Sequence, residues 1–193
     1  MTRFLAVILI VLAGQSIGAA AEMRSIDVQY EDSHYMVVSV VWFDAGVGPM
    51  FDVFSRWELS PEFSGAVVEA RDLEPDEYGR PGFFVVNRGC VLFFCKSLTR
   101  QGYVESEEGR VLRAFADPLR SDFKVSNEAW EFAEESGGTI VTYTLDMQPD
   151  FWVPPAIGPY LIKRKLKKDG TNALNRIEAI AQVMESRDGI ILD

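Results

Sequence analysis

Apolar and polar residues alternate along most of the chain from residue 26 to residue 147, a pattern that predicts antiparallel strands with one face toward a core. The expected strands cover residues 26–30, 34–43, 66–73, 83–98, 101–106, 110–116, 127–134 and 139–147. Turn sequences such as EDS, SEEG and ESGG connect several of them and predict hairpins. In the run 34–43 both faces are apolar, which is typical of a strand covered on both sides.

Two other segments have the spacing of helices. Residues 48–59 place Met50, Phe51, Val53, Phe54 and Trp57 on one buried face, so we expect one or two short helices there, closed by Pro61. Four prolines between residues 149 and 159 then stop the strand pattern, because proline has no backbone donor for a β-ladder.

A long helix is predicted to follow, from about residue 155 to about residue 185. Its apolar arc contains Leu166 and Ile177, and Gly170 lies in the same arc. Because a glycine inside a helix costs about 1 kcal/mol relative to alanine, Gly170 favours close approach of the helix to a sheet or room for a ligand. A local kink is the alternative.

This order of elements predicts an α+β fold. We expect a curved antiparallel sheet wrapped around one long C-terminal helix, with two short helices after the first strand. Residues 22–193 form a single domain in this interpretation, since no repeat or linker divides them.

The first 21 residues have the pattern of an export signal. Arg3 precedes an almost wholly aliphatic run, and Ala19 and Ala21 give the small-x-small pattern before a cleavage site. An uncleaved membrane anchor is the alternative, but ten apolar helical residues span only about 15 Å, half of a bilayer core. We therefore expect cleavage after Ala21 and a periplasmic or secreted protein.

The chain carries 29 acidic side chains against 19 Lys and Arg, which argues against nucleic acid as the main partner. Its one histidine, His34, excludes a His-rich metal centre, and neither a G-x-S-x-G nucleophile motif nor a Gly-rich phosphate loop occurs. We predict no catalytic residue, metal or cofactor from the sequence. Oligomeric state is left open.

Cys90 and Cys95 are the two cysteines of the chain, in GCVLFFCKS. In a straight strand they would be about 16 Å apart, whereas the Cα atoms of a disulfide lie within about 7 Å. The segment VLFF contains no turn residue, which favours two buried free thiols. A local disulfide, which needs a turn or bulge between them, is the alternative.

Two motifs resemble the START-like superfamily, which also holds polyketide cyclases, ligand-binding plant allergens and coenzyme-Q-binding proteins. The stronger is WEFAEESGGTIVTYTLDMQPDFWVPPAIGPYLIKRKL, where Trp130, Tyr143 and the proline corner match the family pattern, and the weaker is GPMFDVFSRWELSPEF. The resemblance implies a helix-grip fold over residues 26–184 with a hydrophobic cavity between sheet and helix. It also implies lipids, sterols, quinones or polyketides as guests, although many of these relatives are cytoplasmic.

On this basis we expect an exported binder or carrier of a hydrophobic small molecule such as a lipid. Its candidate lining residues are Trp130, Phe132, Tyr143, Met147, Leu166, Gly170 and Ile177. Arg88 and Arg113 would bind a ligand carboxylate or oxyanion if they point inward, while exposure at the surface is the alternative. A cyclase, aromatase or hydrolase in the same cavity is a second hypothesis, and a structural protein with a filled interior is a third.

A basic segment stands out on this acidic chain. Lys163, Arg164, Lys167 and Lys168, with Trp152 nearby, predict transient docking on an anionic membrane surface. A solvated helix face is the alternative.

Overall fold

The computed structural model describes residues 20–91, 94–151 and 158–191, with the side chains of 90–91, 94, 158–169 and 188–191 outside the description. The strands are β1 (Glu22–Glu31), β2 (His34–Phe43), β3 (Val67–Leu73), β4 (Gly82–Val91), β5 (Phe94–Glu107), β6 (Val111–Ala116), β7 (Phe123–Glu135) and β8 (Gly138–Pro149). The helices are α1 (Val47–Ser55), the 3-10 turn η1 (Trp57–Leu59), α2 (Ser60–Phe63) and α3 (Gly158–Ile191). The class is α+β, as the sequence predicts.

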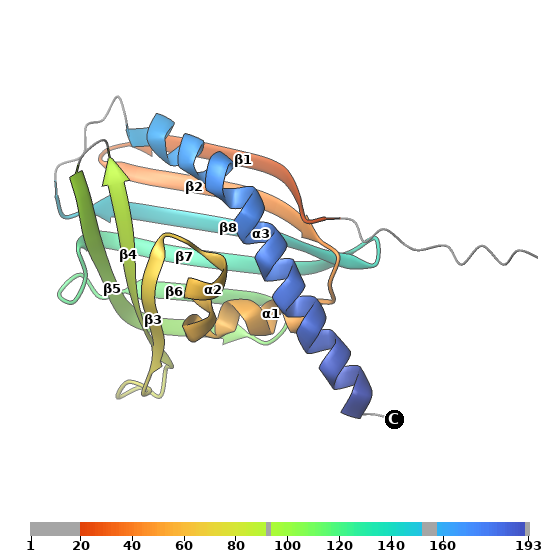
Figure 1. The fold of residues 1–193 in the computed structure, drawn as a ribbon. Helices are drawn as coiled ribbons and strands as arrows, with labels where there is room; N and C mark the ends of the chain where they lie inside the picture. The colour runs from red at the N-terminus through yellow and green to blue at the C-terminus, as the bar shows by residue number, and fades with distance from the viewer. Residues whose placement is uncertain (1–19, 92–93, 152–157, 192–193) are drawn as a thin grey trace, which may run out of the picture.

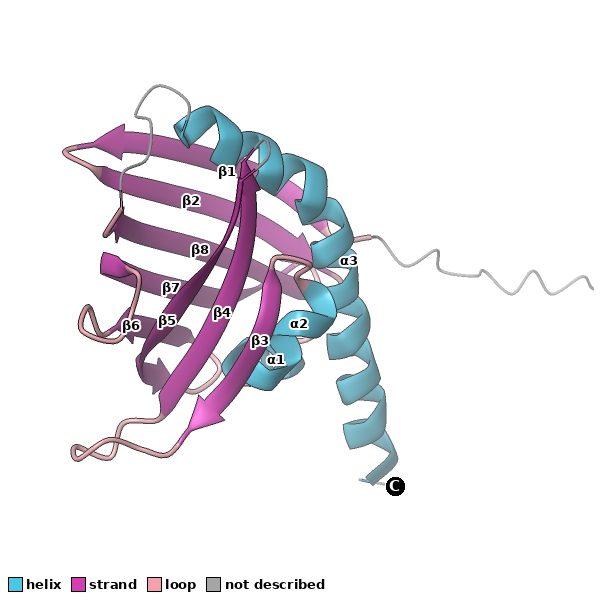
Figure 2. Ribbon diagram, turned by 60° about the vertical axis from the view of Figure 1, so that its left-hand side comes forward, coloured by secondary structure: helices cyan, strands magenta, loops and turns pink. Residues whose placement is uncertain are grey.

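All eight strands form one antiparallel sheet in the order β1-β2-β8-β7-β6-β5-β4-β3. The sheet is strongly curved, and α3 crosses its concave side diagonally, next to α1 and α2 (Figures 1 and 2). The short helices follow β2, not the first strand, because the first two alternating runs form one hairpin. Pro61 lies in the first turn of α2, so it begins a helix there and does not close the region.

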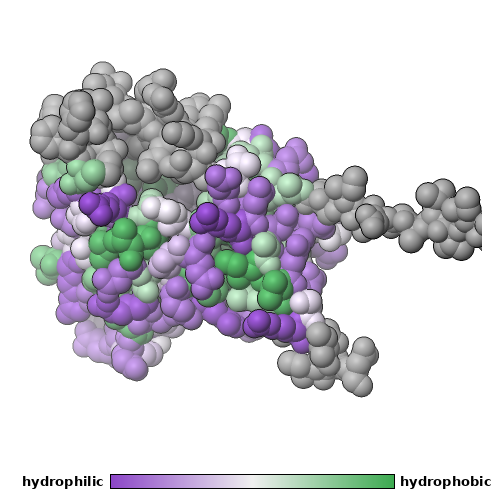
Figure 3. All heavy atoms as spheres, in the orientation of Figure 1, coloured by the Kyte–Doolittle hydropathy of each residue, from purple (hydrophilic) through white to green (hydrophobic). Residues whose placement is uncertain are grey.

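The alternation of burial identifies the inner face of the sheet. In β2, Tyr35, Val37 and Phe43 are at most 2% exposed, whereas Val38 on the other face is 43% exposed. The prediction that β2 is covered on both faces is therefore wrong. On the side of the molecule shown in Figure 3, polar residues cover most of the described surface and apolar residues form separate small patches.

The predicted single strand 83–98 is also wrong, because its residues belong to two strands, β4 and β5, which pair antiparallel with Val91 opposite Phe94. Cys90 stands opposite Cys95 in the register of these two strands, and Cys95 is disulfide-bonded. Cys90 is the only other cysteine in the chain. The expectation of two free thiols is wrong because β4 and β5 pair antiparallel, although the sequence between the two cysteines holds no Gly, Pro, Asn or Asp.

Strand β5 changes partners along its length. Residues 94–103 pair with β4 and residues 102–107 pair with β6, so the two ladders overlap only around Gly102. Figure 2 shows β4 and β5 steeply inclined to β7 and β8. A strand that switches ladders in this way forms a corner of the sheet.

The second half of α3 is fixed to the segment between β2 and α1. Ile177 and Ala181 are buried in the core. Glu178, which is 7% exposed, accepts a hydrogen bond from the backbone N–H of Asp44 at 2.7 Å, and Gln182 donates to the Asp44 carbonyl at 2.7 Å. These bonds satisfy a buried carboxylate and hold the helix against the sheet.

Gly170 is not needed for close packing. Helix α3 runs through it without interruption, and a methyl group added there would meet, among described atoms, only Met23 Cε at 3.9 Å. That is ordinary van der Waals contact, so the predicted close approach of helix to sheet at Gly170 is corrected.

Candidate functional site

A cavity of about 480 Å³ lies between the inner face of the sheet, the short helices and the second half of α3. The described residues that line it are Ser39, Val41, Phe43, Phe54, Trp57, Ser60, Phe63, Ser64, Val67, Val85, Asn87, Leu98, Arg100, Phe123, Ser126, Glu128, Trp130, Val141, Tyr143, Leu145, Met147, Ala173, Leu174 and Ile177. A volume of this size is typical of pockets for small organic ligands. The third hypothesis, in which side chains fill the interior, does not agree with a cavity of this volume.

Aromatic side chains form much of the wall. The Trp130 ring lies 5.3 Å from that of Tyr143 and 6.0 Å from that of Phe54, measured between ring centroids. Trp57 lies over Phe83 with a centroid separation of 4.4 Å and nearly parallel planes. Such contacts fix the ring orientations, so this part of the wall is preformed.

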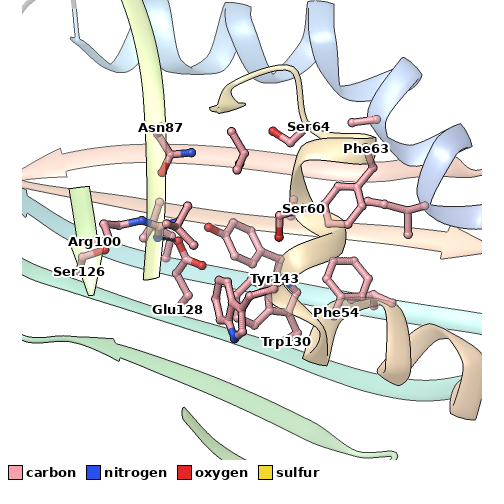
Figure 4. Close-up of a pocket in the computed structure, with 18 of the residues that line it drawn as sticks. Phe54, Ser60, Phe63, Ser64, Asn87, Arg100, Ser126, Glu128, Trp130 and Tyr143 are labelled. Carbon is pink, nitrogen blue, oxygen red and sulfur yellow. Dashed lines mark hydrogen bonds and ion pairs between the residues drawn. The ribbon is translucent and has the colours of Figure 1, made fainter. Parts of the chain in front are cut away.

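A charged pair interrupts the apolar wall. The Arg100 guanidinium, on β5, forms an ion pair with the Glu128 carboxylate on β7, and the two side chains are 14% and 7% exposed. Figure 4 shows the pair on one side of the cavity, while Phe54 and Phe63 stand on the other. Of the described residues that line the cavity, these two are the ones that carry charge.

Tyr143, on β8, completes this polar region. Burial raises the pKa of Tyr143 to about 12, although the Arg100 charge acts in the opposite direction. Burial lowers the pKa of Arg100, while Tyr143 acts to raise it. The tyrosine hydroxyl therefore stays protonated at neutral pH, and it offers one donor and one acceptor without adding charge.

The placement of the predicted lining residues is mixed. Trp130, Tyr143, Met147 and Ile177 line the cavity. Phe132 is 7% exposed and packs between Phe51 and Phe54 outside the lining. Gly170 is not among the lining residues, and the side chain of Leu166 lies outside the described residues.

The two predicted arginines are on the outer face of the sheet. Arg88 is exposed, and Arg113 is 40% exposed with its guanidinium 3.9 Å from Glu107. Their neighbours Asn87, Leu112 and Ala114 point inward, and side chains along a strand alternate. The expectation of an inward Arg88 or Arg113 is corrected, and the inward arginine is Arg100.

Sequence reasoning missed Arg100 because it fell in a gap between two expected strands. When residues 94–107 are taken as one strand, Leu98, Arg100 and Val104 all fall on its inner face. The alternation through SLTRQGYV is the signal that identifies it.

The predicted membrane-docking residues are not tested. Trp152 and the side chains of Lys163, Arg164, Lys167 and Lys168 lie outside the described residues. Within the described part of the chain, no helix is both long enough and apolar enough to span a bilayer. The same residues contain no group of three His, Cys, Asp or Glu side chains placed to hold a metal.

A pair of carboxyl groups fixes the short helices to the edge of the sheet. Asp72 on β3 accepts a 3.5 Å hydrogen bond from the backbone N–H of Trp57, which lines the cavity. Burial raises the pKa of Asp72 to about 6, with further contributions from hydrogen bonding to Glu58 and from its charge. The same side-chain hydrogen bond lowers the pKa of Glu58. The two groups therefore share a proton in mildly acidic solution.

We expect Asp72→Asn to stabilise the protein at pH 7.5 and to flatten its pH dependence. The raised pKa of Asp72 means that the folded state binds its proton more tightly than the unfolded state does. Protonation of Asp72 therefore stabilises the wild-type fold fully below pH 3.8, and this contribution is lost as pH rises through about 6. Asparagine keeps a hydrogen bond without the repulsion. Because Asp72 is only partly buried, screening by solvent limits the gain to about 1 kcal/mol or less. Urea unfolding at pH 4.5, 6 and 7.5 measures it, and equal pH slopes for the two proteins would contradict it.

No protein-family model matches the sequence, and no curated protein matches it significantly. Solved structures do. A START superfamily protein from Mycobacterium smegmatis aligns with a TM-score of 0.60 at 16% identity, over 77% of this chain and 98% of that one. The STAR-related lipid transfer protein from Xanthomonas axonopodis aligns with a TM-score of 0.58 at 11% identity, over 85% and 99%.

The Zhui aromatase/cyclase from Streptomyces sp. R1128 aligns with a TM-score of 0.57 at 12% identity, over 77% of this chain and 94% of that one. At these identities the likeness shows the fold alone. The comparisons confirm the START-like fold that the sequence motifs resemble.

Proposed function

We propose, on the basis of the START-like fold, that this protein is exported and binds or carries a hydrophobic small molecule. The molecule would lie between the sheet and α3. The observation that carries the proposal is the cavity of about 480 Å³, with mostly apolar walls and one buried polar region. Apolar burial at about 25 cal/mol per Å² would supply affinity, and the polar groups would orient the guest. Neighbouring folds of a lipid transfer protein and of an aromatase/cyclase support a guest of this kind.

Two features support the export part of the proposal. The N-terminal 21 residues have the composition of a cleavable signal, and β1 begins at Glu22, directly after the expected cleavage position. The disulfide at Cys95 suits an oxidising compartment. Transient docking on anionic membranes through Lys163, Arg164, Lys167 and Lys168 is part of the proposal as a prediction from the sequence.

The test is mass spectrometry of the protein secreted from cells through its own signal. Native spectra are expected to show a mature chain that begins at Glu22, with one disulfide and a bound small molecule that denaturation releases. The extracted molecule should then rebind the emptied protein in a one-to-one ratio. An emptied protein that takes up neither the extract nor any apolar probe would overturn the proposal.

Catalysis in the same cavity is the second candidate, and the buried Arg100–Glu128 pair beside Tyr143 favours it. A pair of this kind would orient a reacting carbonyl and polarise it. Incubation of the extracted guest with excess protein distinguishes the two, because a carrier returns the guest unchanged and an enzyme changes its mass or isomer.

A further inference from the structure

We propose that Glu128 sets the charge selectivity of the cavity, so that the site accepts guests whose buried end is an uncharged hydroxyl or carbonyl and rejects anionic ones. This inference rests on the proposed function, since it specifies the ligand of the same cavity.

The charge argument starts from the ion pair. Arg100 and Glu128 neutralise one another inside the wall, and no other described lining residue is charged. An anionic guest would bring a second negative charge next to Glu128 in a poorly hydrated place. Such a charge has no partner of its own, and an unpaired buried charge is strongly unfavourable.

An uncharged polar end avoids this cost. Arginine has five N–H donors and a carboxylate has two acceptor oxygens, so the Arg100–Glu128 contact leaves groups of both kinds for a ligand. The protonated Tyr143 hydroxyl adds a further donor and acceptor. A ligand hydroxyl donates to Glu128 and accepts from Arg100 or Tyr143 without changing the net charge.

The volume suits a single-chain probe. A cavity of about 480 Å³ is in the range of pockets that take small organic ligands, so a sixteen-carbon alcohol or carboxylate is a suitable guest with which to test the charge argument.

Substitution Glu128→Gln tests the inference with two probes of equal chain length, hexadecanol and hexadecanoate. The amide retains an acceptor for Arg100 but removes the negative charge, which leaves a net positive site. Wild type is expected to bind hexadecanol at least about tenfold more tightly than hexadecanoate at pH 8, and Glu128→Gln to reverse that preference. Titration of emptied protein, with tryptophan fluorescence or calorimetry as readout, gives both affinities.

Glu131→Gln is the matched control, because Glu131 is on the same strand β7 but exposed on the outer face. It removes the same charge from the protein and should leave the ratio of the two affinities unchanged. Thermal melting checks that each variant is folded. If Glu128→Gln does not fold, the ratio for wild type alone decides the inference.

The outcomes separate the inference from the function on which it rests. Equal wild-type affinities for the two probes, or an unchanged ratio in folded Glu128→Gln, would overturn charge selection while the carrier function stands. Failure of wild type to bind any apolar probe overturns the carrier function, and the inference with it.

Discussion

Ala173→Trp is expected to abolish binding of apolar ligands, with at least a tenfold loss of affinity for hexadecanol, while the protein stays folded. Ala173 lines the cavity from α3 and is only half-buried. An indole at this position occupies the space of the guest and takes over its apolar contacts. Filling an existing void adds packing contacts, so the thermal midpoint should be equal or higher.

Ala179→Trp is the matched control for this experiment. Ala179 lies on the same helix but is exposed, so its substitution adds the same side chain outside the cavity. Affinity for hexadecanol should then equal that of wild type, measured by the same fluorescence titration. Full binding by folded Ala173→Trp would place the ligand site elsewhere on the protein.

Gly102→Ala is expected to lower the free energy of unfolding by about 3 kcal/mol. A Cβ atom at Gly102 would lie 1.9 Å from the carbonyl oxygen of Phe115 and 2.8 Å from the Cα of Ala116. Both are backbone atoms of β6, so no side-chain rotation relieves the contact. The strands must separate where β5 passes from one ladder to the other, which opens the corner of the sheet.

Gly89→Ala is the corresponding control, since Gly89 is in the neighbouring strand β4 and its added Cβ would meet nothing within 4 Å among described atoms. Its effect should be neutral or slightly stabilising, because glycine loses more conformational freedom on folding than alanine. Denaturant unfolding compares the two variants. Equal stabilities would show that the close approach at Gly102 relaxes without cost.

The sequence predicted best those elements whose periodicity is unambiguous. In β7 and β8 one face is apolar and the other polar, so the alternation alone was enough to assign Trp130, Tyr143 and Met147 to one side of the sheet. The long helix was equally clear from its apolar arc, and its Ile177 reaches the cavity. Local pattern sufficed here because the inner and outer positions of each element differ in polarity.

The same reasoning failed where position depends on a neighbour. The sequence that joins β4 to β5 is apolar, so the division into two strands, and with it the pairing of Cys90 with Cys95, could not be found from turn chemistry. Arg100 then seemed to lie between strands, and Arg88 and Arg113 were proposed in its place. Counted from the buried Phe83 and Leu112, strand alternation places Arg88 and Arg113 on the outer face, so the pattern within their own strands gave no support for an inward arginine there.

The order of strands has a consequence for how the chain folds. Strand β2 pairs with β8, so Tyr35 is opposite Met147, while every other pairing in the sheet joins consecutive strands. The N-terminal hairpin thus completes its ladder only after most of the polypeptide has been synthesised. Closing so large a loop costs entropy before it returns any contact energy, which slows the rate-limiting step. We expect the first hairpin to dock last, against a preformed meander of β3 to β8.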